Sequence, residues 1–292
     1  MSTDGLIVVD KEPGMTSHDV VARLRRIART RKVGHGGTLD PMATGVLVIG
    51  VGRATRLLTY VVGTAKVYSG TIRLGQATTT DDAEGDVTQS VPAGHLSDTQ
   101  LREQLAAMTG EVDQVPSSVS AIKVKGVRSY HRVRQGEEVQ LEPRRVTISR
   151  IDVQGISRIG DLVDVEVEVA CSSGTYIRAI ARDLGAAFGV GGHLTALRRS
   201  AVGDFSLAEA RTLGQLAELD DPVTLPLSEA LARALPVISV DAEQARTVTH
   251  GGPLPQTGIP GPYGVIGPDG TALAVMSDRD GRARPEIVLV GS

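Results

Sequence analysis

Four positions of the sequence carry side chains of the types that do chemistry. Asp40 stands in the irregular stretch "GHGGTLDPMATG", with an apolar run directly after it. Tyr68 lies in a predicted strand, while Tyr176 and Arg178 lie at the start of a predicted helix. An enclosed carboxylate can act as a nucleophile or as a base. Taken one at a time, the four residues also have structural interpretations: Asp40 as a turn residue, the two tyrosines as packed side chains and Arg178 as a solvated helix charge. The structural and the functional interpretation therefore both stay open.

The charge distribution indicates a polyanionic partner, although the net charge of −3 does not. Residues 20–39 contain six Lys or Arg and no acid, and residues 117–135 contain five and no acid. Acidic residues gather instead at 80–86 and 217–221. Either basic window alone is equally typical of a solvated helix face. The two together favour binding to a phosphate backbone.

Composition and missing motifs narrow the function classes. The chain has 292 residues, 41% of them apolar, which is enough for one large domain or two unequal ones. Cys171 is the single cysteine, so internal disulfides and multi-cysteine zinc sites are excluded, and we expect it to be buried. No P-loop, His-Glu-x-x-His or Gly-x-Gly-x-x-Gly motif occurs. Without a long apolar run or a signal-peptide pattern, the sequence predicts a cytoplasmic protein.

Hydrophobic periodicity predicts the elements that must position these side chains. A helix at 15–29 has Thr16 and Asp19 spaced as a capping box, one apolar face and one arginine-rich face. A strand at 66–75 places Tyr68 on the same face as Ile72 and Leu74. The other predicted elements are strands at 5–11, 46–52 and 161–170, helices at 97–109, 176–189 and 227–235, and a hairpin at 263–276.

The stretch around Asp40 extends to "GHGGTLDPMATGVLVIGVGRATR", which resembles the catalytic motif of the TruB family of tRNA pseudouridine synthases. The resemblance continues, in the family's order, through "DKEPGMTSHDVV", "YSGTIRLGQATTTDDAEGDV", "QVPSSVSAIKVKGVRSYHRVRQGEEV", "CSSGTYIRAIARDLG" and "GGHLTALRRSAVGDF". These segments cover most of residues 5–206. A coincidence over so many motifs is implausible.

The resemblance assigns catalytic roles to three positions. It implies that Asp40 is the catalytic aspartate and that Arg178 is the arginine that pairs with it. Tyr68 corresponds to the tyrosine that packs against the target base. His35, which on its own is typical of a loop-stabilising residue, corresponds to the histidine that occupies the space of the flipped nucleotide.

Further positions of this sequence match family residues around the base. Lys11 and Pro13 correspond to a Lys-x-Pro element near the active site, and Leu197 corresponds to a leucine that lines the base pocket. Tyr176 corresponds to the tyrosine that helps to position the base or the aspartate. One departure is Gly36, where the family commonly has Thr. A second is the short, slightly acidic C-terminal segment, which resembles a reduced PUA domain.

The implied function is isomerisation of the uridine at position 55 in the T loop of tRNA to pseudouridine, by base flipping, cleavage of the glycosidic bond and C–C re-attachment. The implied fold is α+β, with a mixed, largely antiparallel sheet, flanking helices and a small β-rich PUA-like C-terminal domain. We expect a catalytic domain at 1–235, with an RNA-facing basic insert at about 111–150, and a PUA-like domain at 236–292. No cofactor, metal, membrane or obligate protein partner is expected; the partner is the tRNA T stem-loop, bound by a monomer.

Three alternatives remain open from the sequence. A pure RNA-binding or RNA-folding protein would need the basic windows and the C-terminal domain but not Asp40. A glycoside hydrolase usually needs a second carboxylate near the first, and residues 30–80 contain no acid other than Asp40. A guide-RNA-dependent uridine isomerase shares the core motifs, and activity of the protein alone on a T stem-loop would separate it from the main prediction.

Overall fold

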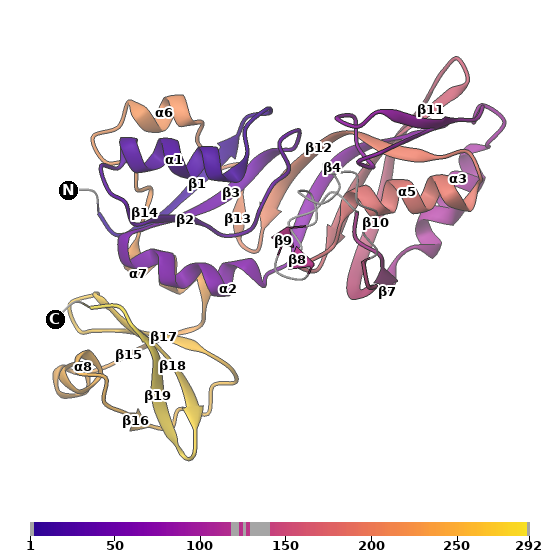
Figure 1. The fold of residues 1–292 in the computed structure, drawn as a ribbon. Helices are drawn as coiled ribbons and strands as arrows, with labels where there is room; N and C mark the ends of the chain where they lie inside the picture. Colours follow the sequence, from indigo (N-terminus) through magenta and orange to yellow (C-terminus); the bar gives the residue numbers. More distant parts are fainter. Residues whose placement is uncertain (1–2, 118–122, 125–126, 129–140, 291–292) are drawn as a thin grey trace. The chain divides into compact units, whose positions relative to one another are not determined.

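The computed structural model describes residues 3–117, 123–124, 127–128 and 141–290. The chain divides into two compact units (Figure 1). Unit 1 comprises Met1–Pro41, Gly45–Gly63 and Val202–Ser292, and unit 2 comprises Met42–Thr44 and Thr64–Ala201. Each unit has its own strands and helices and is described separately.

The first part of unit 1 is built on β1, the predicted strand, whose Ile7, Val8 and Val9 are fully buried. β1 pairs antiparallel with β3 from Gly5↔Val51 to Lys11↔Gly45, so Lys11 lies at the end of the strand nearest the segment that contains Asp40. β14 pairs with the other edge of β1, and β2 pairs antiparallel with β3. The bounds of these strands are β1 (Gly5–Lys11), β2 (Val33–His35), β3 (Thr44–Val51), β13 (Phe205–Ser206) and β14 (Leu225–Pro226).

Helix α1 begins with the predicted capping box. Asp19 N donates to the side chain of Thr16, and the Asp19 carboxylate accepts from the backbone of Thr16. Val20, Val21 and Leu24 are buried on the apolar face, as the periodicity predicts. The helical elements of this part are α1 (Ser17–Ile27), the 3-10 helix η1 (Gly52–Leu57), α2 (Leu58–Val62), α6 (Leu213–Ala217) and α7 (Leu227–Ala234).

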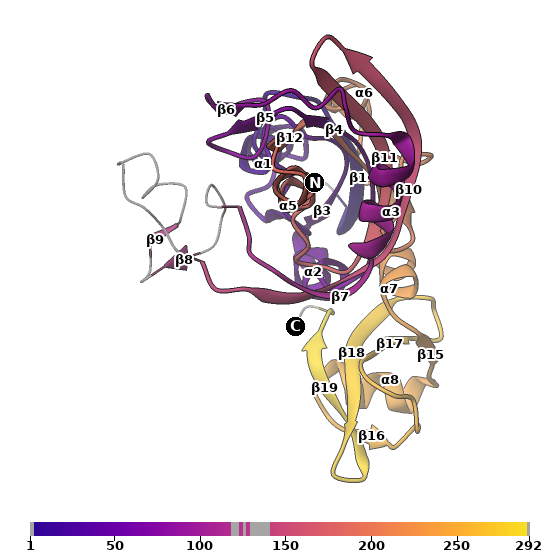
Figure 2. The same cartoon turned by 90° about the vertical axis from the view of Figure 1, so that its right-hand side faces the viewer.

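The C-terminal part of unit 1 is a small β-rich body. Its strands follow the order β15-β17-β18-β19-β16, and α8 packs against β18 and β19 (Figure 2). The predicted hairpin is confirmed as β17 and β18, whose turn is held by a hydrogen bond from Thr271 N to Asp269 Oδ1 at 3.0 Å. The bounds are β15 (Val237–Ser239), α8 (Ala242–Thr249), β16 (Leu254–Pro255), β17 (Tyr263–Ile266), β18 (Ala272–Arg279) and β19 (Arg282–Val288).

Unit 2 contains a sheet in the order β12-β4-β11-β10-β7. Tyr68 on β4 faces inward with Ile72 and Leu74, and Cys171 at the end of β11 is 2% exposed, both as predicted. The bounds are β4 (Lys66–Leu74), β5 (Gln76–Thr78), β6 (Val87–Ser90), α3 (Asp98–Ala107), β7 (Gly110–Gln114), β8 (Lys123–Val124), β9 (Val127–Arg128), β10 (Arg144–Ile159), β11 (Leu162–Cys171), α5 (Ile177–Ala187) and β12 (Gly192–Val202).

The predicted α+β class is therefore confirmed, with antiparallel pairing in most of the sheet. The predicted basic insert at about 111–150 falls partly outside the described residues, and most of the second basic window lies there. The predicted domain boundary between 235 and 236 stays a prediction.

Candidate active site

Asp40 lies in the irregular connection between β2 and β3 in unit 1. The two strands pair from Val33↔Val51 to His35↔Ile49, and Gly36 N then donates to Val48 O at 2.7 Å. After that bond the chain leaves the ladder, with Gly37 at a φ of 106°, a conformation that glycine adopts readily. Asp40 is half-buried at this point. The glycines therefore let the chain turn out of the sheet and present one carboxylate.

The backbone on both sides of Asp40 is held by the segment that joins β1 to α1. On one side, Leu39 N donates to Ser17 Oγ at 2.8 Å, and Ser17 Oγ donates to Leu39 O at 3.2 Å. On the other side, Pro41 O accepts from Lys11 Nζ at 3.1 Å and from Gly14 N at 2.9 Å. Asp40 is thus fixed through its neighbours, and these bonds do not use its own carboxylate.

Lys11 is a fully buried cation at the end of β1. Its ammonium group also donates to the carbonyl oxygens of Glu12 at 2.9 Å and Met15 at 2.8 Å. Three carbonyl acceptors offset much of the cost of burying the charge. The predicted Lys-x-Pro element is therefore a brace for two loops, and Pro13 itself lies exposed in the turn that Lys11 closes.

His35 occupies the last position of β2 and is half-buried. Its ring contacts His18 of α1 edge-on, with 5.3 Å between the centroids and an interplanar angle of 78°. Since β2 runs directly into the Asp40 connection, His35, Lys11 and Asp40 belong to one neighbourhood of unit 1. The roles predicted for these three positions stay predictions.

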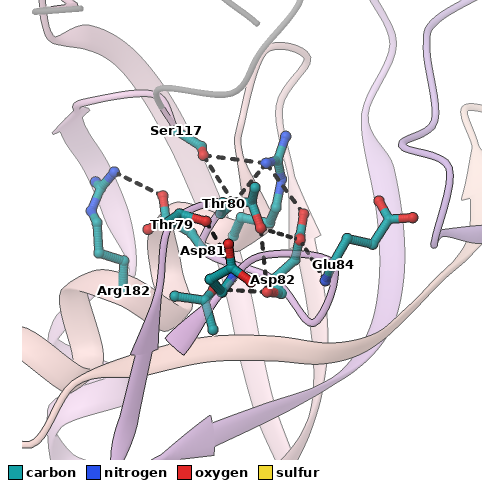
Figure 3. Close-up of polar contacts among 10 residues, drawn as sticks. Thr79, Thr80, Asp81, Asp82, Glu84, Ser117 and Arg182 are labelled. Atoms are coloured by element: carbon teal, nitrogen blue, oxygen red, sulfur yellow. Dashed lines mark hydrogen bonds and ion pairs between the residues drawn. The ribbon is translucent and has the colours of Figure 1, made fainter. Parts of the chain in front are cut away.

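Arg178 stands in the first turn of α5 in unit 2 and is 4% exposed. Its Nη1 forms an ion pair with Asp82 Oδ2 at 3.3 Å and donates to Thr80 O at 2.8 Å and Ser117 Oγ at 3.2 Å. Figure 3 shows Thr80, Asp82 and Ser117 gathered around one guanidinium. Because the pair is buried and hydrogen-bonded, the geometry of this guanidinium is well defined.

The loop between β5 and β6 is built to present Asp82. Asp82 Oδ1 accepts from Thr80 Oγ1 at 2.5 Å and from Glu84 N at 3.1 Å, and Asp82 O accepts from Thr78 Oγ1 at 2.7 Å. Asp81 next to it has a φ of 60° and forms a longer ion pair with Arg182, at 3.5 Å. Burial raises the pKa of Asp81, against the effect of the Arg182 guanidinium.

Sequence analysis missed the part played by Asp82, Thr80 and Ser117. From the sequence alone, residues 80–86 are recognisable only as an acidic segment. The available signal was chemical: an arginine on the buried side of an apolar helix needs a carboxylate partner, and "TDDAEGD" supplies candidates close to a strand.

The remaining predicted residues of unit 2 lie around β4, β12 and the start of α5. Tyr68 is 7% exposed and Leu197 is 8% exposed, on the neighbouring strands β4 and β12. Gly70 allows these strands to approach closely, because a Cβ at this position would lie 3.1 Å from Ala196 O. Tyr176 caps α5, and its backbone N and O are both held by the Gln114 side chain, at 2.8 and 3.1 Å.

The eight predicted residues thus fall into two sets. Unit 1 carries Lys11, Pro13, His35 and Asp40, and unit 2 carries Tyr68, Tyr176, Arg178 and Leu197. The pairing of Asp40 with Arg178 stays a prediction. In the described part of the chain, no cluster of three or more His, Cys, Asp or Glu could hold a metal ion. Among the same residues, no helix is long and apolar enough to cross a membrane.

Comparison with known protein families gives matches along nearly the whole chain. Residues 25–177 match "TruB family pseudouridylate synthase (N terminal domain)". Residues 178–233 match "tRNA pseudouridylate synthase B C-terminal domain", and residues 235–290 match "tRNA Pseudouridine synthase II, C terminal".

Full-length relatives and solved structures agree with these matches. The chain is 53% identical to a tRNA pseudouridine synthase B of Thermobifida fusca, over 99% of both chains. It is 56% identical to one of Nocardia farcinica, over 98% of this chain and 93% of the relative. A chain in a crystal structure of a Cbf5-Nop10-Gar1 complex is 25% identical with a TM-score of 0.73, covering 98% of this chain and 85% of that chain. The predicted α+β core with a small PUA-like C-terminal domain is confirmed.

Proposed function

Because the chain belongs to the TruB family and is a tRNA pseudouridine synthase, an isomerase, we propose that it acts on the uridine at position 55 of the tRNA T loop. The proposal is carried by one observation: a single carboxylate, Asp40, sits in a loop whose backbone is held on both sides by Ser17 and Lys11. Such bracing suits a side chain that must meet a substrate atom in a fixed geometry.

The reaction requires little from the protein beyond a placed carboxylate and a shaped pocket. The glycosidic C–N bond of the uridine breaks, the uracil turns, and a C–C bond forms to the same sugar carbon. Nothing is oxidised and no group leaves, so the proposal includes no cofactor and no metal. Asp40 acts as nucleophile or as base in these steps, as carboxylates do at sugar centres in glycosidases.

Arg178 is the proposed partner of Asp40. A guanidinium next to an enclosed carboxylate favours its ionised form and offsets the cost of burying the charge. The contacts of Arg178 with Asp82, Thr80 and Ser117 support this role. Because the five N–H donors of a guanidinium lie in one plane, fixing Nη1 also fixes the direction of the others.

The base-contacting roles are proposed for the apolar and aromatic residues. A uridine stacked in a folded loop must be flipped out before an enclosed carboxylate can reach it. Tyr68 stacks on the flipped base, Leu197 lines its pocket, and Tyr176 positions the base or Asp40. His35 takes the space that the base leaves. Lys11 and Pro13 act indirectly, through the loop that carries Asp40.

The partner proposed is the T stem-loop of tRNA, bound by a monomer in the cytoplasm without an obligate protein partner. The similar chain in the solved Cbf5-Nop10-Gar1 complex has protein partners there. A requirement for such partners would make this chain inactive on its own. Isomerisation of an isolated T stem-loop by the purified protein would exclude that requirement.

The decisive experiment measures release of tritium from carbon-5-labelled uridine in a T stem-loop, with wild type and Asp40→Asn compared in metal-free buffer. We expect release by the wild type alone. Asp40→Asn should bind the RNA within about tenfold of wild type, because phosphate contacts supply most of the affinity. A folded wild type that binds the stem-loop without releasing tritium would instead favour an RNA-binding protein. Loss of binding in a folded Asp40→Asn variant would contradict the assigned role.

A further inference from the structure

The exposed side of α1 carries three arginines of the first basic window, residues 20–39. Arg23, Arg26 and Arg29 are spaced three residues apart, and all three are exposed. Arg23 and Arg26 lie within α1, where residues three apart share one side of the helix, about 4.5 Å apart along its axis, and Arg29 follows the helix cap. We call these three residues the α1 arginine row. Arg25, on the same helix, differs because its guanidinium donates to Val33 O at 3.3 Å.

The guanidinium groups of the row make no direct polar contact inside the described part of the protein. Among the described residues, no hydrogen bond or ion pair involves the guanidinium of Arg23, Arg26 or Arg29. Asp19, one turn before Arg23, is bonded to Thr16, and these hydrogen bonds together with the Arg23 charge lower the pKa of Asp19. Two other surface arginines are paired: Arg150 with Asp152 and Glu168, and Arg158 with Asp98.

Arg29 also occupies a position that favours glycine. It has a φ of 51° directly after the helix cap, where Arg29 N donates to Arg26 O at 3.2 Å and Thr30 N donates to Arg25 O at 3.1 Å. This pair of bonds is the Schellman ending, whose left-handed residue is usually glycine. An arginine there has an unfavourable backbone conformation, which is expected where the side chain itself has a use.

The helix that carries the row starts beside the loop that carries Asp40. α1 begins at Ser17, whose hydroxyl is bonded to Leu39, and a rise of 1.5 Å per residue places Arg23 about 9 Å and Arg26 about 14 Å further along the helix axis. We propose that the α1 arginine row binds backbone phosphates of the tRNA T stem, next to the loop that contains the flipped nucleotide. This inference rests on the proposed function, which places the target uridine at Asp40.

The test compares two double variants with the same change in charge. Arg26→Gln/Arg29→Gln removes two members of the row, and Arg150→Gln/Arg158→Gln removes two paired surface arginines. Binding to an isolated T stem-loop is measured from 50 to 300 mM KCl. The row variant should bind about tenfold or more weakly at 0.1 M salt, with a salt slope smaller by roughly 0.7 to 0.9 per lost contact. The control should keep the wild-type salt slope and the wild-type kcat at saturating RNA.

Arg29→Gly separates binding from folding. Glycine relieves the left-handed conformation, so Tm should stay the same or rise while the affinity for the stem-loop falls. If Arg29 had only a structural role, Arg29→Gly would lower both Tm and the affinity for the stem-loop.

An unchanged salt slope in the row variant overturns the proposal, as does an equal loss in the control. A loss seen with whole tRNA but not with the stem-loop overturns the assignment to the T stem. Tritium release by wild type on the same RNA tests the proposed function separately. If binding depended on the row but no tritium were released, the proposed isomerisation would be refuted and the proposed phosphate binding would stand.

Discussion

The two charged residues proposed for catalysis are held in opposite ways. Asp40 in unit 1 is fixed through the peptide groups of Leu39 and Pro41, which Ser17, Lys11 and Gly14 bind. Arg178 in unit 2 is fixed through its own guanidinium, which Asp82, Thr80 and Ser117 bind. Backbone bracing fixes the loop that carries a side chain, whereas side-chain bracing gives a cation of fixed direction. A residue that reacts and a residue that supports it therefore need different surroundings.

Loss of the partner of Arg178 should have the largest effect. Asp82→Asn keeps a hydrogen-bond acceptor for Thr80 and Glu84 but removes the buried countercharge of Arg178. Removing one member of a buried ion pair typically costs about 3–5 kcal/mol. We expect the free energy of unfolding to fall by about 3 kcal/mol and kcat to fall by about 100-fold or more, because the direction of the guanidinium is lost. Urea unfolding and single-turnover tritium release measure the two effects.

The neighbouring residue provides the control for that variant. Asp81→Asn weakens a more exposed ion pair, in which the Arg182 side chain is 29% exposed, and such pairs contribute about 0–1 kcal/mol. Asn also accepts the left-handed conformation that Asp81 adopts. If Asp81→Asn reduced kcat as much as Asp82→Asn, the loop as a whole and not the Arg178 contact would be responsible.

The sequence was informative wherever a local pattern decided the structure. The strand at 5–11, the capping box of Thr16 and Asp19 and the buried face of Tyr68 all depend on residues close together in the chain, and all are confirmed. The long strand β10 was missed. Its register shifts between Ile148 and Arg150 and again between Val153 and Gly155, and each bulge displaces the apolar alternation by one residue. Without a steady period of two, the pattern is not recognisable as a strand.

The candidate site could be predicted only in part for a related reason. Family motifs identify which residues act, and a sequence can carry that information without any geometry. The contacts that hold those residues join positions far apart in the chain, such as Ser17 with Leu39 and Arg178 with Asp82. Neither pair has a spacing that indicates contact, so the supports of the site emerge only from the fold.

Loss of the hydrogen bonds that hold the Asp40 loop should have a smaller effect, and this effect should be on kcat. Ser17→Ala leaves Leu39 N without its buried acceptor, which costs about 1–3 kcal/mol of stability. A shift of the loop by a fraction of an ångström should lower kcat about tenfold with KM unchanged, since misplacement by about 1 Å can cost 100-fold. Thr16→Ala is the matched control, because it removes the cap of the same helix, at about 1 kcal/mol, without touching Leu39. Equal kcat values for the two variants would show that α1 stability, not the Leu39 contact, matters.

The smallest effect concerns Lys11 and Lys66, the two lysines that are buried in the described part of the chain, one in each unit. Lys11 is surrounded by three carbonyl acceptors, whereas Lys66 at the start of β4 donates to Thr64 O at 2.8 Å and lies near the Arg199 guanidinium. Burial and the Arg199 charge lower the pKa of Lys66 from 10.5 to about 8. Between these two pH values the unfolded chain binds more protons at this group than the folded chain does. The contribution of Lys66 to stability must therefore rise with pH across that range.

Comparison with a neutral variant isolates this contribution. The unfolding free energy of wild type minus that of Lys66→Met should increase by about 1–2 kcal/mol from pH 8 to pH 10.5, a value reduced for solvent screening. The same difference for Lys32→Met should stay flat, because Lys32 is exposed. Urea unfolding at several pH values gives both curves. A flat curve for Lys66 would mean that the folded protein and water stabilise its ammonium group equally. Lys66 and the carbonyl-bound Lys11 would then differ only in hydrogen-bond geometry.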